Sequence, residues 1–375
     1  MQELNFEELI KLRKELHKNP ELAGKEKNTS ARIKNFIENF NPDETITGLG
    51  GNGIAFIFKG SNEGKTILFR SELDALPIQE QNDFDYKSSA DNVAHKCGHD
   101  GHMTILSGLA SLFKNQKPEK GKVVFLFQPA EETGEGAKRV LEDKNFSRIK
   151  PDYVFALHNL PGFPLSSVIV KPGIFAAASK GMIIKLYGKT SHASEPENGI
   201  TPTPATALII EKLPVVPNKI LSKNNFGLVT IIHVRIGDVA FGTTPGYAEI
   251  MATLRSYKNE DMKQITTACE KIVKEESEKY GLSYSIEWTE EFPSSINNDD
   301  CIEVVKKCSE KLNLNIIDLE KPFKWSEDFG HFLEKYKGAI FGIGSGKDHP
   351  DLHNPDYDFP DEIIGPSVNL FYSMI

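Results

Sequence analysis

The chain has 375 residues and a formal net charge of −9 at pH 7, with 39% hydrophobic and 26% charged residues. This length exceeds the size at which one hydrophobic core stops growing, so we expect two domains, or one domain interrupted by another. The negative charge repels phosphate backbones, and nucleic acid is therefore not an expected partner. The sequence contains neither an apolar run long enough for a membrane span nor a signal-peptide core, and its four cysteines form no C-x-x-C pair. These features predict a cytoplasmic protein without membrane contact or disulfides.

The amino-terminal part of the chain alternates helical and strand patterns. Apolar residues at helical spacing predict one helix that ends before Pro20 and a second helix capped by Thr29 or Ser30. Short apolar runs then predict four strands, with a helix over 103–113 between the second and third of them. These strands cover residues 54–58, 66–69, 123–127 and 153–157. The alternation of strands and helices predicts an α/β sheet.

From about residue 179 the pattern changes to strand, helix, two strands, helix and strand, which is the ferredoxin-like order. The expected elements are 182–187, 204–213, 228–234, 248–254, a long helix with Asn259 as N-cap and Gly281 after its end, and 283–288. A unit of different periodicity between α/β segments predicts an inserted domain. We therefore expect one domain built from residues 1–178 and 291–375, and a second domain over 179–290.

Polar residues follow the carboxyl ends of three predicted strands. They are Glu72 and Asp74, then Glu131 and Glu132, and then His158. In open α/β sheets this edge carries the functional site, so we expect these distant residues to meet at one rim.

The stretch from His95 to His102 holds three histidines, a thiol and a carboxylate. Cys97 and His99 flank one glycine, so an extended loop would turn both side chains toward one point, as metal ligands require. With Glu132, His158 and a folded-back His353, they form a mixed set of sulfur, nitrogen and oxygen ligands. Five ligands are too many for one tetrahedral zinc ion and favour two ions that share a bridging ligand and a water molecule. One of the adjacent glutamates at 131 and 132 remains as a general base, and the residues alone do not decide which.

Eight motifs extend over nearly the whole chain: RKELHKNPEL, FRSELDALPIQE, HKCGHDGHM, FQPAEETGEGA, ALHNLP, GKTSHASEPENG, SEDFGHF and LHNP, in that order. Together they closely resemble the dinuclear metal-dependent amidohydrolases that include hippurate hydrolase, N-acyl-amino-acid hydrolases and the plant auxin-conjugate hydrolases. The resemblance implies a metallopeptidase-like catalytic domain, with a mixed sheet flanked by helices. It also implies an inserted ferredoxin-like α+β domain that acts as a lid and forms a homodimer.

The resemblance also implies a role for individual residues. The implied metal ligands are Cys97, His99, Glu132, His158 and His353. Glu131 would be the general base, Asp74 would hold a ligand or the site loop, His192 would stabilise the tetrahedral oxyanion, and Arg255 would lie near the substrate. Two divalent ions are implied, for which zinc suits the thiolate and manganese, nickel or cobalt are alternatives.

Some positions depart from the family pattern or carry no expected role. Gly242 stands where we expect an asparagine that binds the substrate carboxylate or carbonyl, and this leaves the recognised acyl or amino-acid portion open. Lys96, where relatives often carry a small residue, is expected to be solvated. We expect His17, His233 and His331 to be packing residues.

The sequence therefore predicts the hydrolysis of the amide bond of an N-acyl amino acid, or of a related small conjugate, by a metal-bridged hydroxide. A dipeptidase that uses the same centre is the nearest alternative. It would have to hold the free amine of its substrate, and the sequence shows no carboxylate that is clearly reserved for that amine. A non-catalytic metal-binding regulatory protein is a third alternative, although every expected ligand and both glutamates are present.

Overall fold

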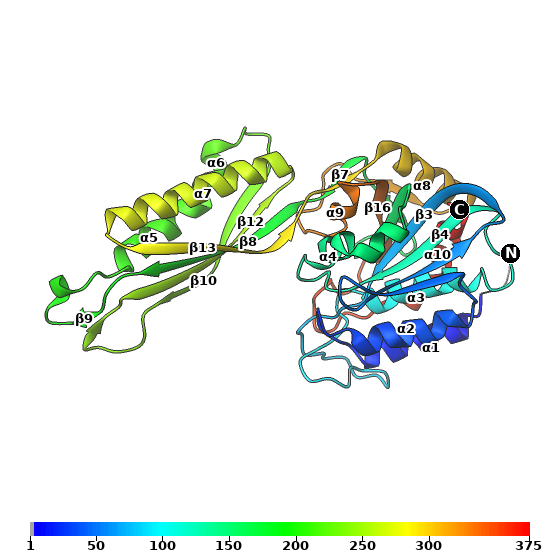
Figure 1. The fold of residues 1–375 in the computed structure, drawn as a ribbon, viewed down its shortest axis with the longest axis horizontal. Coiled ribbons are helices and arrows are strands. Elements are labelled where there is room, and N and C mark those ends of the chain that lie inside the picture. The colour runs from blue at the N-terminus through cyan, green and yellow to red at the C-terminus, as the bar shows by residue number, and fades with distance from the viewer. Residues whose placement is uncertain (1–3) are drawn as a thin grey trace. The chain divides into compact units, whose positions relative to one another are not determined.

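The computed structural model describes residues 4–375, which form two compact units (Figure 1). The first unit contains the chain up to Phe175 together with Ser295–Lys321 and Asp328–Ile375. The second unit contains Ala176–Ser294 and the short segment Pro322–Glu327. The pattern of helices and strands gave no indication that this short segment returns to the second unit.

The first unit is built on a mixed sheet of eight strands in the order β1-β2-β4-β3-β5-β16-β6-β15. The strands are β1 (Glu44–Leu49), β2 (Gly53–Lys59), β3 (Asn62–Glu72), β4 (Lys120–Gln128), β5 (Tyr153–Pro161), β6 (Val168–Val170), β15 (Ile316–Asp318) and β16 (Lys337–Gly346). The four central strands, β4, β3, β5 and β16, are parallel to their neighbours in this group. Their carboxyl ends therefore share one edge, where the sequence places its polar residues.

Helices flank this sheet and are labelled in Figure 1. They are α1 (Phe6–Lys18), α2 (Lys27–Glu38), α3 (His99–Ser111), α4 (Gly136–Glu142), α8 (Asp299–Lys311), α9 (Gly330–Leu333) and α10 (Ile364–Ser373), and two short strands, β7 (Gly173–Ala176) and β14 (Ser295–Asn297), pair with each other. The second helix begins before the predicted cap. The carboxylate of Glu21, outside this helix, accepts the amide and hydroxyl hydrogens of Thr29, at 2.7 and 2.9 Å, so Thr29 lies inside the first turn.

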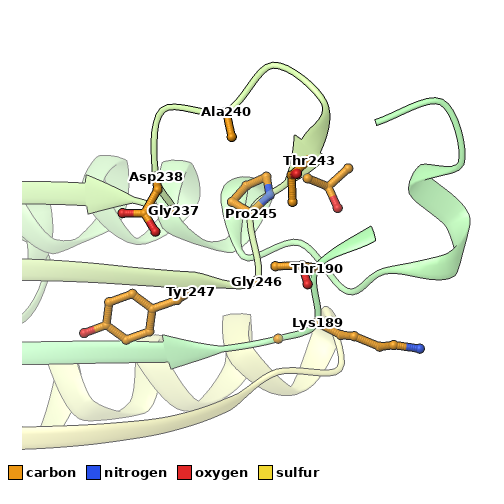
Figure 2. Close-up of a pocket in the computed structure, with 11 residues that line it drawn as sticks. Lys189, Thr190, Gly237, Asp238, Ala240, Thr243, Pro245, Gly246 and Tyr247 are labelled. Carbon is orange, nitrogen blue, oxygen red and sulfur yellow. The ribbon is translucent and has the colours of Figure 1, made fainter. Parts of the chain in front are cut away.

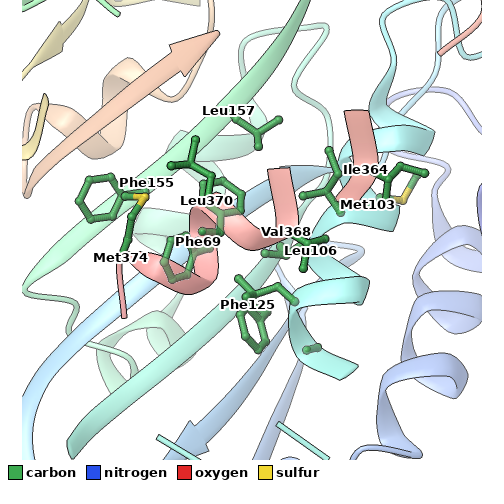
Figure 3. Packing of buried hydrophobic residues seen from close by; sticks show 14 of the residues in the cluster. Phe69, Met103, Leu106, Phe125, Phe155, Leu157, Ile364, Val368, Leu370 and Met374 are labelled. Atoms are coloured by element: carbon green, nitrogen blue, oxygen red, sulfur yellow. The ribbon is translucent and has the colours of Figure 1, made fainter. Parts of the chain in front are cut away.

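The core of the first unit joins the central strands to α3 and α10 (Figure 3). The strands contribute Phe69, Phe125 and Phe155, which are nearly or fully buried. The ring of Phe69 lies 4.7 Å from that of Phe371 on α10, centroid to centroid, and 6.0 Å from that of Phe155. Because α3 is buried along almost its whole length, its first residues are fixed against the sheet.

The second unit is a four-stranded antiparallel sheet in the order β10-β12-β8-β13, packed against α5 and α7. Its elements are β8 (Ala178–Tyr187), β9 (Ser191–His192), α5 (Thr203–Lys212), α6 (Val216–Ile220), β10 (Gly227–Ile236), β11 (Thr243–Thr244), β12 (Tyr247–Ser256), α7 (Asn259–Lys279) and β13 (Ser283–Phe292). This order of elements confirms the predicted ferredoxin-like plan. Within residues 4–375, each helix is either too short or too polar to cross a bilayer.

Candidate metal centre

The carboxyl edge of the parallel strands gathers the expected site residues of the first unit. Asp74 follows β3, the two adjacent glutamates follow β4, and His353 lies in the segment after β16. His158 lies inside β5, which continues to Pro161. The prediction that His158 follows the strand is therefore wrong, because the backbone pairing of β5 with β16 extends beyond the apolar run.

Cys97 and His99 are separated by a sharp turn at the start of α3. Gly98 is the N-cap residue of α3 and has a φ of +93°, so His99 is the first helical residue. The expectation of an extended loop is wrong here. A Cβ atom at Gly98 would lie 2.4 Å from Oδ1 of Asn159, and the left-handed conformation also disfavours any side chain. Only glycine therefore allows this turn to bring the thiol and the imidazole together.

Two histidines present the same ring nitrogen to the site. Nδ1 of His99 lies 2.8 Å from the carbonyl oxygen of Asp74, and Nδ1 of His158 lies 2.9 Å from the carbonyl oxygen of Asn159. A carbonyl only accepts, so each Nδ1 carries the proton and each Nε2 is the unprotonated nitrogen, the one that can bind a metal ion. Nε2 of His158 lies 3.5 Å from Sγ of Cys97. Burial lowers the pKa of His99 well below its usual range, which keeps this ring neutral, as a metal ligand must be.

Asp74 holds the segment that carries both glutamates. Its two carboxylate oxygens accept the backbone amides of Glu131 and Glu132, at 3.1 and 3.0 Å. The side chains of both glutamates then reach the same histidine, with Oε2 of Glu131 3.9 Å and Oε1 of Glu132 3.8 Å from Nε2 of His99. Burial and the charge of Glu26 raise the pKa of Asp74 to about 7, against the effect of the two amides.

His353 reaches the site from the far end of the chain. Its backbone amide donates to the carbonyl oxygen of Lys96 at 2.7 Å, and its φ of +66° turns the segment at this residue. Nε2 of His353 lies 3.9 Å from Oε2 of Glu132. The side chain is 53% exposed, so the backbone contacts hold it more firmly than packing does.

Three groups of these side chains have the spacing that a metal ion needs, with ligand atoms within 4.8 Å of one another. They are Cys97, His99 and His158; Cys97, Glu132 and His353; and His99, Glu131 and Glu132. The buried Nε2 atom of His99 has no hydrogen-bond partner among residues 4–375. A buried polar atom of this kind is costly without a partner, and a divalent ion supplies one. The residues therefore fit a metal centre with thiolate, imidazole and carboxylate ligands.

A further group, Glu72, His99 and His102, also satisfies this spacing. However, both ring nitrogens of His102 are already engaged. Nδ1 lies 2.7 Å from the carboxylate of Glu72 and Nε2 lies 2.6 Å from Oδ1 of Asn159. His102 therefore orients the neighbours of the site, including the asparagine whose carbonyl receives the proton of His158.

Asp328 is a site neighbour that the sequence interpretation missed. Its backbone amide donates to Oε1 of Glu131 at 3.4 Å, and its carboxylate receives Arg70 at 2.6 Å and Gln128 at 2.8 Å. All four side chains are buried. The SEDFG motif could have indicated a role for Asp328. The motif lies far from Glu131 along the chain, so the sequence alone did not predict their contact.

Lys96 is fully buried, so the prediction of a solvated lysine is wrong. Its ammonium group donates to Oε1 of Glu80 at 2.5 Å and to the carbonyl oxygen of Tyr357 at 2.7 Å. The expectation of a packing role is confirmed for His17, which is also fully buried. It is wrong for His233, which is exposed on β10.

His192 and Arg255 both belong to the second unit. His192 is exposed on β9, and its Nδ1 lies 2.6 Å from Oγ of Ser194. Arg255, on β12, donates to Oγ of Ser326 at 3.0 Å. The carbonyl oxygen of Gly242 accepts the amide of Ala193 at 3.0 Å, which places the AFGTTP segment beside His192. A Cβ atom at Gly242 would meet nothing within 4 Å, so packing does not require glycine there.

A hollow of about 550 Å³ lies in the same part of the second unit (Figure 2). It is formed where the loop before β11 approaches the end of β8. Its lining is Gly188, Lys189, Thr190, Gly237, Asp238, Ala240, Thr243, Thr244, Pro245, Gly246 and Tyr247. None of these lining residues belongs to the ligand set at the sheet edge of the first unit.

Comparisons with known proteins agree with this geometry. Residues 68–375 match the family described as peptidase family M20/M25/M40. The hippurate hydrolase of Campylobacter jejuni is 32% identical over 97% of this chain and 94% of its own length, and an N-acetyl-L-cysteine deacetylase of Bacillus subtilis is 31% identical over 97% and 86%. A solved structure from Bacillus subtilis, described as a dinuclear metal-binding peptidase of the M20 family, has a TM-score of 0.82 and 26% identity, and covers 98% of this chain and 96% of its own. The chain therefore belongs to peptidase family M20/M25/M40.

Proposed function

We propose that this protein is a metal-dependent amidohydrolase that cleaves the amide bond of an N-acyl amino acid or of a related small conjugate. The observation that carries this proposal is the meeting of thiolate, imidazole and carboxylate ligands next to a second, buried glutamate. The hippurate hydrolase and N-acetylcysteine deacetylase relatives support this substrate class, because each aligns with almost the whole chain.

In this proposal two divalent ions are held by five side chains. The ligands are Cys97, His99, Glu132, His158 and His353. The thiolate suits zinc, while manganese, nickel and cobalt are alternatives whose occupancy depends on supply as well as affinity. Ions bound there would polarise the amide carbonyl and lower the pKa of a water molecule.

Glu131 is the proposed general base. Its side chain is 7% exposed, and its carboxylate is fixed by the amide of Asp328 and by the position of its own backbone on Asp74. From this position Glu131 takes a proton from the attacking water and delivers it to the amine nitrogen as the carbon–nitrogen bond breaks. Asp74 acts by holding the backbone of both glutamates, and not by touching the substrate.

The second unit supplies the proposed substrate contacts. His192 donates a hydrogen bond to the tetrahedral oxyanion, and Arg255 binds the substrate. The exposure of His192 on a two-residue strand supports this role, because the side chain is free to reach a ligand.

We also propose that the second unit forms a homodimer. Strand β10 is at the edge of its sheet and carries apolar side chains that are exposed, with Leu228 at 42%, Ile232 at 60% and Val234 at 36%. An apolar edge strand favours pairing with another chain. The four cysteines are buried and form no disulfide with one another, which supports a cytoplasmic location.

The substrate class is tested by amine release from N-acetyl, N-benzoyl and indole-acetyl amino acids beside dipeptides. Protein stripped of metal would be reloaded with zinc or manganese. Metal-dependent cleavage of the acylated compounds is expected, whereas cleavage of dipeptides alone would move the assignment to a peptidase.

The role of Glu131 is tested by substitution. Glu131→Gln should keep the metal and reduce kcat by at least about a hundredfold. The matched control is Glu135→Gln, at an exposed acid on the same loop.

The dimer is tested by light scattering and by mixing two inactive variants. If His192 acts on the site of the partner subunit, His192→Ala mixed with Glu131→Gln should recover activity through hybrid dimers. A monomer in solution would refute the proposed assembly. An absence of recovery despite verified subunit exchange would show that His192 acts within its own subunit or has no catalytic role.

A further inference from the structure

The segment that carries His353 is held by a series of hydrogen bonds from two short stretches of the chain. The carbonyl oxygen of Lys96 accepts the amide of His353 at 2.7 Å, and the amide of Gln81 donates to the carbonyl oxygen of Pro355 at 3.0 Å. Nδ2 of Asn82 donates to the carbonyl oxygen of Asp356 at 3.0 Å. These bonds fix a segment that has no regular secondary structure of its own.

Lys96 contributes twice to this series, through its backbone and through its side chain. Its ammonium group donates to the carbonyl oxygen of Tyr357 at 2.7 Å and to Oε1 of Glu80 at 2.5 Å. Lys96 is fully buried and Glu80 is 2% exposed. A buried ammonium needs such a counter-charge, and once it is paired it has few alternative positions. The side chain of Lys96 therefore connects the stretch around Glu80 to the end of the segment that carries His353.

The partner of Lys96 is itself held in place. The carboxylate of Glu80 also receives Nε2 of His17 at 2.9 Å and the backbone amide of Ser88 at 2.6 Å. Nδ1 of His17 lies 2.9 Å from the carboxylate of Asp100, which is the second residue of α3. Through Glu80 and His17, the ammonium group of Lys96 is thus connected to α3, the helix that begins with His99.

We propose that Lys96 is a positioning residue that holds His353 at the distance the metal centre requires. This inference rests on the proposed function, because it takes His353 to be a ligand. Cys97 and His99 are fixed by the glycine turn and by α3, whereas the side chain of His353 is 53% exposed and depends on its backbone. Loss of the ammonium group should therefore weaken the binding of the ion that uses His353. The binding of the ion held by Cys97, His99 and His158 should stay unchanged.

The experiment compares metal binding by wild type, Lys96→Met and Asn82→Ala, with Lys347→Met as a control at an exposed lysine. Isothermal titration of metal-free protein with zinc, together with elemental analysis, gives the stoichiometry and the two affinities. Lys96→Met should bind one ion as the wild type does and the other at least about tenfold more weakly. Asn82→Ala should weaken the affinity for the same ion by a smaller factor. This second variant still tests the proposal if Lys96→Met fails to fold.

Hydrogen exchange gives a second readout that is independent of turnover. The backbone amides of residues 353, 354, 356 and 357 should exchange faster in both variants, while those of the sheet strands stay unchanged. Unchanged affinities and unchanged exchange in folded variants would overturn the role of Lys96. A wild-type protein that binds fewer than two ions would instead overturn the dinuclear proposal, so the two failures are distinguishable.

Discussion

The protonation of His17 provides a quantitative prediction about stability. This side chain is fully buried, and its two ring nitrogens lie 2.9 Å from the carboxylates of Asp100 and Glu80. Burial alone would lower the pKa of His17, but the hydrogen bonds to the two acids and the charges of Asp100 and Asp358 outweigh it and raise the pKa to about 9. His17 should therefore be a cation at neutral pH in the folded protein.

The sign and size of the effect follow from linkage. A pKa that rises from 6.5 in the unfolded chain to about 9 in the fold corresponds to about 3 kcal/mol, at about 1.36 kcal/mol per pKa unit. The folded state binds the proton more tightly, so this stabilisation is fully present below about pH 6.5. It is lost as the pH rises through about 9, and the free energy of unfolding should fall across this window.

The assay is urea unfolding of metal-free protein, followed by far-ultraviolet circular dichroism at a series of pH values. His17→Gln should remove most of the fall in stability between pH 6.5 and 9, whereas His233→Gln, at an exposed histidine, should leave it unchanged. Both tryptophans, Trp288 and Trp325, lie in the second unit, so their fluorescence reports that unit separately. The same pH dependence of unfolding in wild type and His17→Gln would refute the assignment of His17 as a cation.

Three further substitutions test the site. Gly98→Ala should destabilise the first unit by at least about 2 kcal/mol in urea unfolding, because the left-handed turn disfavours a side chain and Asn159 occupies the space; wild-type stability would contradict this. Cys97→Ser should weaken zinc binding at least about tenfold by calorimetry, with Cys269→Ser as the control at a buried thiol of the second unit; equal affinities would remove Cys97 from the ligands. Asp74→Asn should lower kcat about tenfold or more while keeping metal. The asparagine side chain has one acceptor oxygen, so it can accept a hydrogen bond from only one of the two backbone amides that the carboxylate holds. An unchanged kcat would show that the segment with both glutamates does not need both hydrogen bonds.

The architecture was predictable because apolar periodicity records which faces are buried. Strands β3, β4 and β5 of the first unit, and the order of elements along the chain in the second unit, follow from runs that the sequence shows directly. The shared edge followed in turn, since polar residues after parallel strands must meet. Element ends were less predictable, because hydrogen bonds from outside an element set them, as the carboxylate of Glu21 does for α2.

Two of the missed features depend on partners far away in the sequence. The solvated reading of Lys96 failed because Glu80 and the carbonyl of Tyr357 become its neighbours only in the fold. Asp328 was overlooked for the same reason, since its contact with Glu131 joins distant segments. The turn at Gly98 is different in kind, because a glycine in the sequence does not state the sign of its φ angle.

The place of β16 in the sheet has a consequence for how the protein is made. This strand pairs with β5, yet the ribosome produces it only after the whole of the second unit. The sheet of the second unit can form as soon as β13 has been made. Until β16 follows, one edge of β5 stays unpaired and can pair with a wrong strand. His353, a proposed ligand, follows β16, so a nascent chain lacks the complete proposed ligand set until β16 and the segment after it have been made. We therefore expect metal to bind only after β16 has paired with β5, when all five proposed ligands are present.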